Sequence, residues 1–349
     1  MKTLRPLSLP LRAVAGLVAW VCAGPVHALE PVQGLRSLAM GDSLRAAATG
    51  AEGVLLNPSG IALLRQYIVT GFYSFRIQHL GHALHVSVAD SVTQRRLAMG
   101  LYYTFLRETP QLGLRVAEHE APGSRVISIR DVQMVRHGHE VGLVSAFPLG
   151  DRFILGLTTK YGYFSSTVAL PQDQLPGDFS PSNPRIDADR VYDLGSVNNV
   201  VSFDVGITVR VLDRLTLGLV GQNLWGHGVE QPTMLGSGLA TWLTHRLTIA
   251  ADVLINFTGY QNCVGPDSDP CQEVHNRTVV RAGGGLEYSV ADRLPLRAGY
   301  LYDSHTNGHH VSAGLGYFNP RFAFDLGMRQ RLSGGLETVL LLGFRLFRD

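Results

Sequence analysis

The chain has no long apolar run beyond its N-terminus. No segment after residue 28 has the roughly 20 consecutive apolar residues that a transmembrane helix needs. An excess of charge of one sign is also absent, since Lys+Arg total 30 and Asp+Glu 28, a formal net charge of +2. That balance gives no reason to expect a nucleic-acid partner. Because no apolar run is long enough for a transmembrane helix, any part of the chain that spans a membrane must consist of β-strands.

Cysteine is scarce, with three in 349 residues. Cys22 lies in the N-terminal apolar stretch, whereas Cys263 and Cys271 flank a polar, turn-rich segment. In an oxidising compartment the latter two are expected to form a disulfide in a loop. The alternative is a Ca²⁺ or other metal loop using Asp267 and Asp269, but their spacing matches no known calcium loop. A G-x-S-x-G nucleophile elbow is missing as well. The sequence predicts no enzyme, no catalytic residue, no cofactor and no metal.

The N-terminus has the parts of a secretory signal peptide. It begins with three basic residues, Lys2, Arg5 and Arg12. An apolar stretch follows at 13–21, and a small-x-small cleavage site ends at Ala28. We expect residues 1–28 to be removed, because the alternative, a membrane helix, would be too short to span. Cleavage removes three of the 30 basic residues and none of the 28 acidic ones, which leaves a net charge of about −1 on an exported chain.

Apolar and polar residues alternate from Tyr67 to the C-terminus. Between residues 202 and 211 the odd-numbered positions are apolar and the others polar or small, the period-2 pattern of a strand with one apolar face. With the turn signals, this pattern predicts about fourteen strands, at 67–77, 79–90, 95–107, 138–147, 152–165, 198–212, 214–225, 235–244, 246–257, 276–290, 293–304, 307–318, 321–331 and 335–347. Alternating segments of about ten residues are typical of a transmembrane antiparallel β-barrel, here expected over residues 67–349.

The connections between these strands alternate between short and long. Short turns often end in arginine, as at 150–152 and 212–214, and the long connections are 108–137, 166–197, 226–234 and 258–275. Barrels of the bacterial outer membrane have short periplasmic turns and longer external loops. We therefore expect an outer-membrane location, with lipid and lipopolysaccharide around the barrel and both chain ends in the periplasm. A soluble sandwich would have no reason to separate loop lengths by end.

Two compositional features agree with a barrel. Many of the 39 glycines lie inside strands, where they suit close approach of another backbone. Aromatic residues near strand ends fit interfacial girdles, although ordinary strand enrichment in aromatics is the alternative. The aromatics concerned are Tyr67, Tyr73, Phe75, Tyr103, Tyr161, Tyr163, Tyr300, Tyr302, Tyr317 and Phe318.

Residues 29–66 do not alternate. They contain a small-residue opening at 36–44 with a Met-Gly pair, and an Asn-Pro-Ser-Gly tetrad at 57–60. This segment resembles the N-terminal plug of the FadL-like outer-membrane transporters and their PorV/PorQ-type relatives. The acidic pair of that group is missing, with 50–52 reading Gly-Ala-Glu in its place. The resemblance implies a fourteen-stranded barrel with residues 29–66 folded into the lumen as a plug, or hatch. The candidate plug and gating residues are Arg36, Met40, Gly41, Asn57, Pro58 and Gly60.

The tetrad also has a direct physical interpretation. Asn57 can bond its own backbone and Gly60 can adopt a positive φ, so Asn-Pro-Ser-Gly is a turn. Residues 38–48 are small and moderately helical, which suits the inside of a barrel. The alternative to a gating role is that the tetrad only orders the start of the first strand.

The second face of each strand should line the lumen, where charges at membrane depth pair with one another. These positions predict an ion-pair lattice made of Lys160, Asp204, Arg210, Asp252, Arg277, Arg281, Glu287, Arg297, Asp303, Asp325, Arg329, Glu337 and Arg345. A hydrophobic ligand also needs apolar surface, for which the candidates are Val54, Leu55, Leu56, Ile61, Leu63, Leu64, Tyr102, Leu106, Ile154 and Leu254.

Two functions remain open on the sequence. The first is passive transport of a hydrophobic or amphipathic small molecule, as the FadL-like resemblance implies. The second is a non-conducting adaptor barrel in a secretion, polysaccharide or motility complex, with envelope-protein partners, as the PorV-like resemblance implies.

An enzyme is a distant third possibility. His137 and His139 would share one strand face, with Glu140 on the other. These residues and His309-His310 are better explained as histidines at a loop mouth than as a metal site.

Overall fold

The computed structural model describes residues 32–78, 80–94, 96–109, 111–121, 124–169, 198–225, 231–258, 261–262, 272–273, 278–333 and 337–348. The predicted signal peptide (1–28), Arg277, Cys263 and Cys271 lie outside the described residues. The cleavage site and the disulfide therefore stay predictions. None of the described helices is long and apolar enough to cross a membrane.

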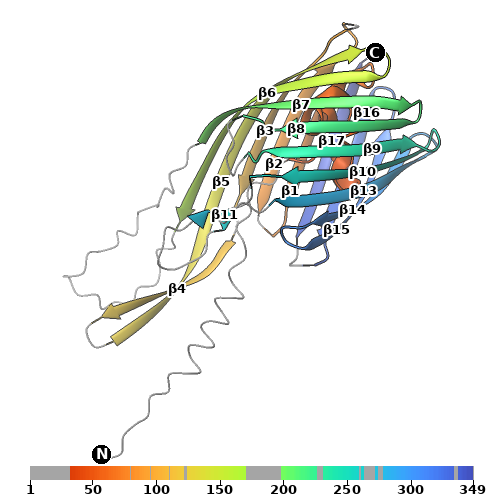
Figure 1. Ribbon diagram of the computed structural model, residues 1–349. Helices are drawn as coiled ribbons and strands as arrows, with labels where there is room; N and C mark the ends of the chain where they lie inside the picture. Colours follow the sequence, from red (N-terminus) through yellow and green to blue (C-terminus); the bar gives the residue numbers. More distant parts are fainter. Residues whose placement is uncertain are drawn as a thin grey trace, which may run out of the picture.

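Fourteen antiparallel strands close into a barrel (Figure 1). They are β1 (Tyr67–Arg76), β2 (Gly81–Asp90), β3 (Ala98–Glu108), β5 (Ser124–Leu149), β6 (Phe153–Ala169), β7 (Asn198–Leu212), β8 (Leu215–Gln222), β9 (Met234–Trp242), β10 (Leu247–Asn256), β13 (Val279–Val290), β14 (Leu294–Asp303), β15 (Gly308–Phe318), β16 (Phe322–Arg331) and β17 (Thr338–Arg348). Pairing of β1 with β17 and of β3 with β5 completes the ring. The predicted fold class is confirmed, and each predicted strand overlaps one of these.

The prediction of a loop at 108–137 is wrong. β4 (Gln111–Ala121) pairs with the first part of β5, and this hairpin extends beyond the barrel (Figure 1). The β-branched residues Val126, Ile127 and Ile129 favour a strand here, so β5 continues far past its barrel portion. The predicted loop 258–275 likewise contains a short pair, β11 (Gln261–Asn262) with β12 (Gln272–Glu273).

The two rims of the barrel differ. β1 starts beside the end of β17, with Tyr67 opposite Arg348, so the start of the first strand and the end of the last strand lie at one rim. That rim also carries the tight turns such as 213–214 and 291–293, and we refer to it as the turn rim. The longer connections, including 170–197 and 223–233, join strands at the opposite rim, the loop rim. The first described residue, Val32, instead lines a cavity near the loop rim, so the expectation that both chain ends share one side is not borne out for the described residues.

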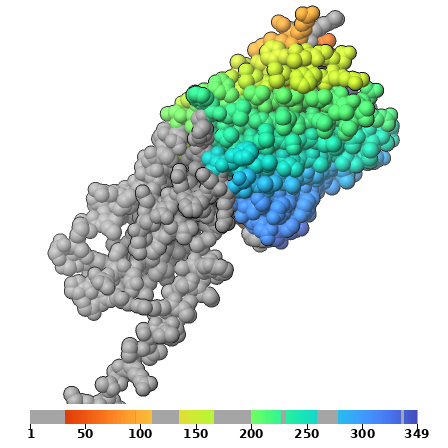
Figure 2. Space-filling model, viewed as in Figure 1, coloured from red at the N-terminus to blue at the C-terminus, as the bar shows by residue number. Residues whose placement is uncertain are grey.

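The outer face of the strands is apolar. In β16 the exposed residues are Phe324, Leu326 and Met328, of which Phe324 is 54% and Leu326 50% exposed. The same alternation of exposed and buried residues runs along β8, β10 and β17. Figure 2 shows the outer surface of the green to blue strands as a continuous wall. So large an exposed apolar surface is stable only against an apolar medium, which makes this a membrane-spanning barrel.

Residues 32–66, the interior segment, lie inside the barrel. They contain two short α-helices, α2 (Leu35–Ala39) and α3 (Ala51–Leu56), and a 3₁₀-helix, η1 (Pro58–Ala62). α2 packs against β14 to β17, α3 against β2 and β3, and η1 against β3 and β5 to β7. The helix expected over 38–48 ends at Ala39, because Gly41 and Asp42 have positive φ and the chain turns there.

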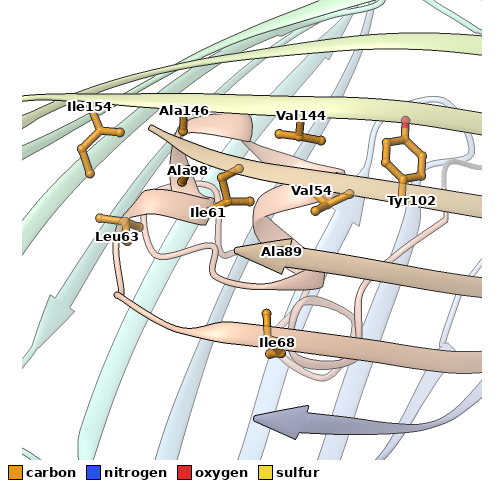
Figure 3. Packing of buried hydrophobic residues seen from close by; sticks show 10 residues of the cluster. All are labelled: Val54, Ile61, Leu63, Ile68, Ala89, Ala98, Tyr102, Val144, Ala146 and Ile154. Carbon is orange, nitrogen blue, oxygen red and sulfur yellow. The ribbon is translucent and has the colours of Figure 1, made fainter. Parts of the chain in front are cut away.

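Apolar residues of the interior segment pack on the inner wall. Val54, Ile61 and Leu63 form one cluster with inward side chains of the surrounding strands (Figure 3). The wall side of that cluster consists of Ile68, Ala89, Ala98, Tyr102, Val144, Ala146 and Ile154. Full burial of each aliphatic side chain contributes about 1.5–3 kcal/mol, so this packing holds the segment in the lumen.

Candidate functional site: the barrel lumen

Inward-facing glycines let the interior segment approach the wall. A Cβ added to Gly283 would lie 1.8 Å from the carbonyl oxygen of Gly41, and one added to Gly206 would lie 2.1 Å from Asn57 Oδ1. Both distances are far below van der Waals contact, so any side chain there would displace the segment. Other inward glycines in similarly close contact with the segment are Gly156, Gly218, Gly285 and Gly299. The strand glycines thus form the seat of the interior segment.

Asn57 joins the interior segment to β7. Its Nδ2 donates to the carbonyl oxygen of Arg45 at 2.8 Å and to Thr208 Oγ1 at 3.3 Å. Its Oδ1 accepts from the backbone N–H and the hydroxyl of Ser59, at 3.3 and 2.7 Å. Asn57 therefore bonds the backbone two residues on, and Pro58 follows as the first residue of η1.

Glycine is required at position 60, but not for the positive φ that the sequence suggested. Its φ is not positive, and it lies inside η1. A Cβ at Gly60 would instead stand 2.2 Å from the carbonyl oxygen of Ala48. Positive φ occurs at Gly41 and Gly50, where the segment reverses direction. Gly60 is thus needed for close packing within the interior segment.

A chain of ion pairs ties α2 to the barrel wall. Arg36 donates to both oxygens of Glu287, at 2.9 and 3.1 Å. Glu287 also accepts from Arg297 at 2.6 Å, and Arg297 donates to Asp325 at 2.5 Å. Asp325 in turn accepts from Arg345 at 2.7 Å. We call these five residues the arginine–acid chain. It links the interior segment to β13, β14, β16 and β17.

Asp252 on β10 holds the turn that follows α2. One of its oxygens accepts from the backbone N–H groups of Leu44 and Arg45 at 2.9 and 2.8 Å, and from Arg45 Nη1 at 3.1 Å. The side chains of Arg45 and Asp252 are only 3% and 2% exposed. Glu52, 1% exposed, accepts from the backbone N–H of Arg36 at 2.8 Å. Arg45 and Glu52 were not among the predicted residues, because charges outside an alternating strand give no signal of facing a lumen.

The remaining predicted lumen charges lie elsewhere on the inner wall. Lys160 pairs with Asp204 at 2.8 Å. Arg210 donates to the carbonyl oxygen of Leu63 at 2.7 Å, so it too contacts the interior segment. Further pairs at 2.7 and 3.7 Å are Arg281 with Asp303 and Arg329 with Glu337. Met40 is fully buried between wall glycines.

A cavity of about 70 Å³ lies on the loop-rim side of α3. Its apolar lining comes from Val32, Leu55, Tyr102, Leu106, Phe164 and Met234. Of the residues predicted to form an apolar pocket, Leu55, Tyr102 and Leu106 line this cavity. Leu254 is buried elsewhere, and Leu64 is exposed. Val54, Ile61, Leu63 and Ile154 pack in the cluster of Figure 3, whereas Leu56 packs in a second cluster with Met40 and Leu44.

Polar residues of the cavity are bonded to one another. Glu140 accepts from Tyr102 and from Gln231 at 2.7 and 2.8 Å. Asp204 accepts from Lys160 and from the backbone N–H of Asn223, both at 2.8 Å. Lys160 and Asp204 are thus paired, and both oxygens of Glu140 accept hydrogen bonds from neutral donors. With its polar groups bonded in this way, the cavity suits an uncharged, largely apolar molecule.

A hollow larger than this cavity lies outside the lumen. It measures about 730 Å³ and lies on the outer wall over β7 to β10, β13 and β14. Small side chains form its floor, among them Ser237, Ala251 and Ala282, and it is bordered by Leu219 and Leu239. Since the rows of outward residues around it are apolar, membrane lipid is its natural surrounding.

The histidines that raised the question of a metal site are separated. His137 and His139 lie on the outward face of β5, whereas Glu140 points into the cavity. His309 contacts tyrosines on the outer face, and its neighbour His310 is buried. Within the described ranges, no three His, Cys, Asp or Glu side chains gather as a metal site requires.

Comparison with known proteins gives a likeness in structure. No protein-family model and no curated protein matches the chain. The Ralstonia pickettii toluene transporter TbuX superposes with a TM-score of 0.64 at 14% identity, over 90% of this chain and 98% of that one. A Pseudomonas aeruginosa FadL homologue gives 0.60 at 12%, over 93% and 100%. The chain has the fold of the FadL-type outer-membrane transporters. The Pseudomonas putida toluene transporter TodX agrees, with 0.59 at 16%, over 93% and 99%.

Proposed function

We propose that the protein is an outer-membrane channel for passive transport of a hydrophobic or amphipathic small molecule, with the interior segment as its plug. The observation that carries the proposal is the course of the segment across the lumen. It contacts the wall from β1 round to β17, and the apolar cavity lies between it and the loop rim. Passage from one rim to the other therefore requires the plug to move.

The ligand class follows from the cavity and from the neighbours in structure. Two of those neighbours are named as toluene transporters and a third as a monoaromatic hydrocarbon channel. The cavity of about 70 Å³ is smaller than the roughly 150 Å³ of an apolar cavity that binds benzene. A ligand of that size must displace side chains of the lining, among which Val32 and Leu55 belong to the interior segment. Where Val32 or Leu55 moves, ligand binding acts directly on the plug.

Deletion of residues 32–56 tests the proposal. Without the plug the fourteen-stranded barrel is wide enough to leave a pore, so single-channel conductance should appear in planar bilayers. Intact protein in liposomes should take up toluene with saturation, and the deletion should lose that saturation. Intact protein without toluene uptake above that of empty liposomes would refute transport.

A second candidate function, an adaptor barrel of an envelope complex, is favoured by one observation. The hairpin of β4 and β5 extends beyond the loop rim, where it offers a surface that the barrel itself does not need (Figure 1). Purification of the intact complex in mild detergent separates the two candidates. A stoichiometric protein partner that is lost on removal of 111–133, together with absent uptake, would establish the adaptor.

A further inference from the structure

The outer face near the loop rim carries one arrangement three times. In each, a tyrosine and a second aromatic residue stand two apart on one strand, and a histidine lies directly opposite the second aromatic on the neighbouring strand. The tyrosine hydroxyl is hydrogen-bonded to the histidine Nδ1 in all three. We call these the Tyr–His units; they are Tyr73/Phe75/His82, Tyr103/Phe105/His139 and Tyr300/Tyr302/His309.

The hydrogen bond in each unit sets what the histidine can do. When the Tyr103 hydroxyl donates to Nδ1 of His139, the neutral ring keeps its proton on Nε2 and remains a donor. Tyrosine and histidine with an apolar body and a polar tip are suited to the boundary between acyl chains and headgroups. The three units therefore mark the depth of the headgroups at the loop rim.

The unit on β3 and β5 has added positive charge beside it, which the unit on β14 and β15 lacks. One step closer to the loop rim, on the same outward face, Arg107 lies directly opposite His137. Arg107 is exposed and forms no ion pair within the described residues. The residues beside this pair on the flanking strands are His82 on β2 and Ser165 on β6. Nothing acidic on this described part of the wall balances the arginine.

Below these basic groups the wall is apolar. Moving away from the loop rim, the outward residues of β3 and β5 are Tyr103 and Val141, then Leu101 and Leu143. The same face thus offers donors and positive charge at the headgroup level, and an exposed aliphatic track at the level of acyl chains. A molecule that satisfies both has an anionic head and apolar tails.

We propose that Arg107, His137 and His139 bind the phosphate of a membrane lipid in the leaflet at the loop rim. A phosphate presents several acceptor oxygens to the planar guanidinium and to imidazole N–H groups, and bonds to charged donors are the strong ones. The acyl chains of the lipid lie along Leu101, Val141 and Leu143. The proposal does not depend on what the lumen transports.

Lipid titration followed by native mass spectrometry tests this site. The full-length protein in neutral detergent is titrated with phosphatidylglycerol, with uncharged diacylglycerol of the same chains, and with inorganic phosphate. A basic residue near an anionic surface is worth about 1 kcal/mol, so Arg107→Gln should weaken the tightest phosphatidylglycerol binding about fivefold. Arg107→Gln with His137→Gln should weaken it further, and diacylglycerol binding should not change.

Two variants serve as controls. His309→Gln removes the histidine of the Tyr–His unit on β14 and β15, which has no arginine opposite or beside it on the outward face within the described part of the wall, and it should leave phosphatidylglycerol binding unchanged. Arg107→Lys keeps the charge and should retain most of the affinity, while heat-modifiable gel mobility shows that each variant is folded. Equal losses for Arg107→Gln and His309→Gln, or an equal loss for diacylglycerol, would overturn the proposal. So would inorganic phosphate that binds as tightly as the lipid, because the tails would then contribute nothing.

Discussion

The outward and inward faces of the same strands obey different rules. On β16 the outward residues Leu326 and Met328 are exposed and need only be apolar. On the inward face Asp325 lies between Arg297 and Arg345, and Gly327 is close to Leu38 of the interior segment. The outer face is thus specified by a solvent and tolerates exchange of one apolar residue for another. The inner face is specified by individual contacts, and a change there acts on a named partner.

The largest effect on stability is expected where an inward charge loses its ionic partner. Arg45→Met leaves Asp252 buried with backbone donors alone, and breaking a buried ion pair costs about 3–5 kcal/mol. The free energy of unfolding, followed by tryptophan fluorescence in urea, should fall by that amount. Because the contact belongs to the interior segment, which we propose to be the plug, conductance should rise as well.

A double variant shows whether that loss comes from the unpaired charge. Arg45→Met with Asp252→Asn removes both charges and keeps an oxygen for the N–H groups of Leu44 and Arg45. It should recover part of the lost free energy. If the double variant is as unstable as Arg45→Met plus Asp252→Asn taken separately, the two side chains are not coupled.

On the outer face the expected effect depends on depth alone. Leu326→Arg places a charge near the middle of β16, where an arginine facing lipid costs about 2–4 kcal/mol. Leu332→Arg, just past the end of the same strand at the loop rim, should cost about 0–1 kcal/mol. Folding into lipid vesicles measures both. Similar losses at the two positions would mean that the wall does not cross a bilayer in the orientation described.

This contrast explains how much the sequence could predict. The outer face obeys a single rule, so its period-2 pattern located all fourteen strands, and the start of β7 at Asn198 and its end at Leu212 match the prediction. The hairpin of β4 was missed because strand residues outside the bilayer have no lipid-facing side. Arg36 and Asn57 came from a resemblance to known plugs and not from periodicity.

The inner face could not be predicted residue by residue. The strand pattern places Thr208 in the lumen, which suggests that a larger polar residue would be tolerated there. In the structure Thr208 is fully buried against Asn57 and Ser59, so Thr208→Arg would displace η1. No pattern within β7 indicates that contact, since the partners are about 150 residues away in the chain. Contacts of that kind depend on the tertiary fold.

Two adjacent glycines on β13 allow the inward and outward faces of the wall to be compared at nearly the same depth in the membrane. Gly283 points inward at Gly41, whereas Gly284 points outward, where an added Cβ would come no closer than 3.6 Å to the carbonyl oxygen of Ala250. Gly283→Val should cost about 1–3 kcal/mol by overpacking and should open the pore by moving the plug. Gly284→Val should leave both unfolding and conductance unchanged. If the two variants behave alike, the inner glycines are not the seat of the interior segment.

The smallest effect is expected for a charge pair that belongs to neither face. Arg246 and Asp292 form a bidentate pair at the turn rim, with side chains 40% and 59% exposed. The hydrogen bond from Arg246, together with its charge, holds the pKa of Asp292 below its ordinary value of 3.8. A carboxyl whose pKa is lower in the folded state stabilises the fold above pH 3.8. That contribution is lost as the pH falls through the lowered pKa.

Asp292→Asn should therefore be slightly less stable than wild type at pH 7 and equal to it in strong acid. Salt should screen the difference at pH 7. Urea unfolding of both proteins across this pH range, at low and high salt, measures it. A difference that persists in acid would show that the turn depends on the shape of Asp292 and not on its charge.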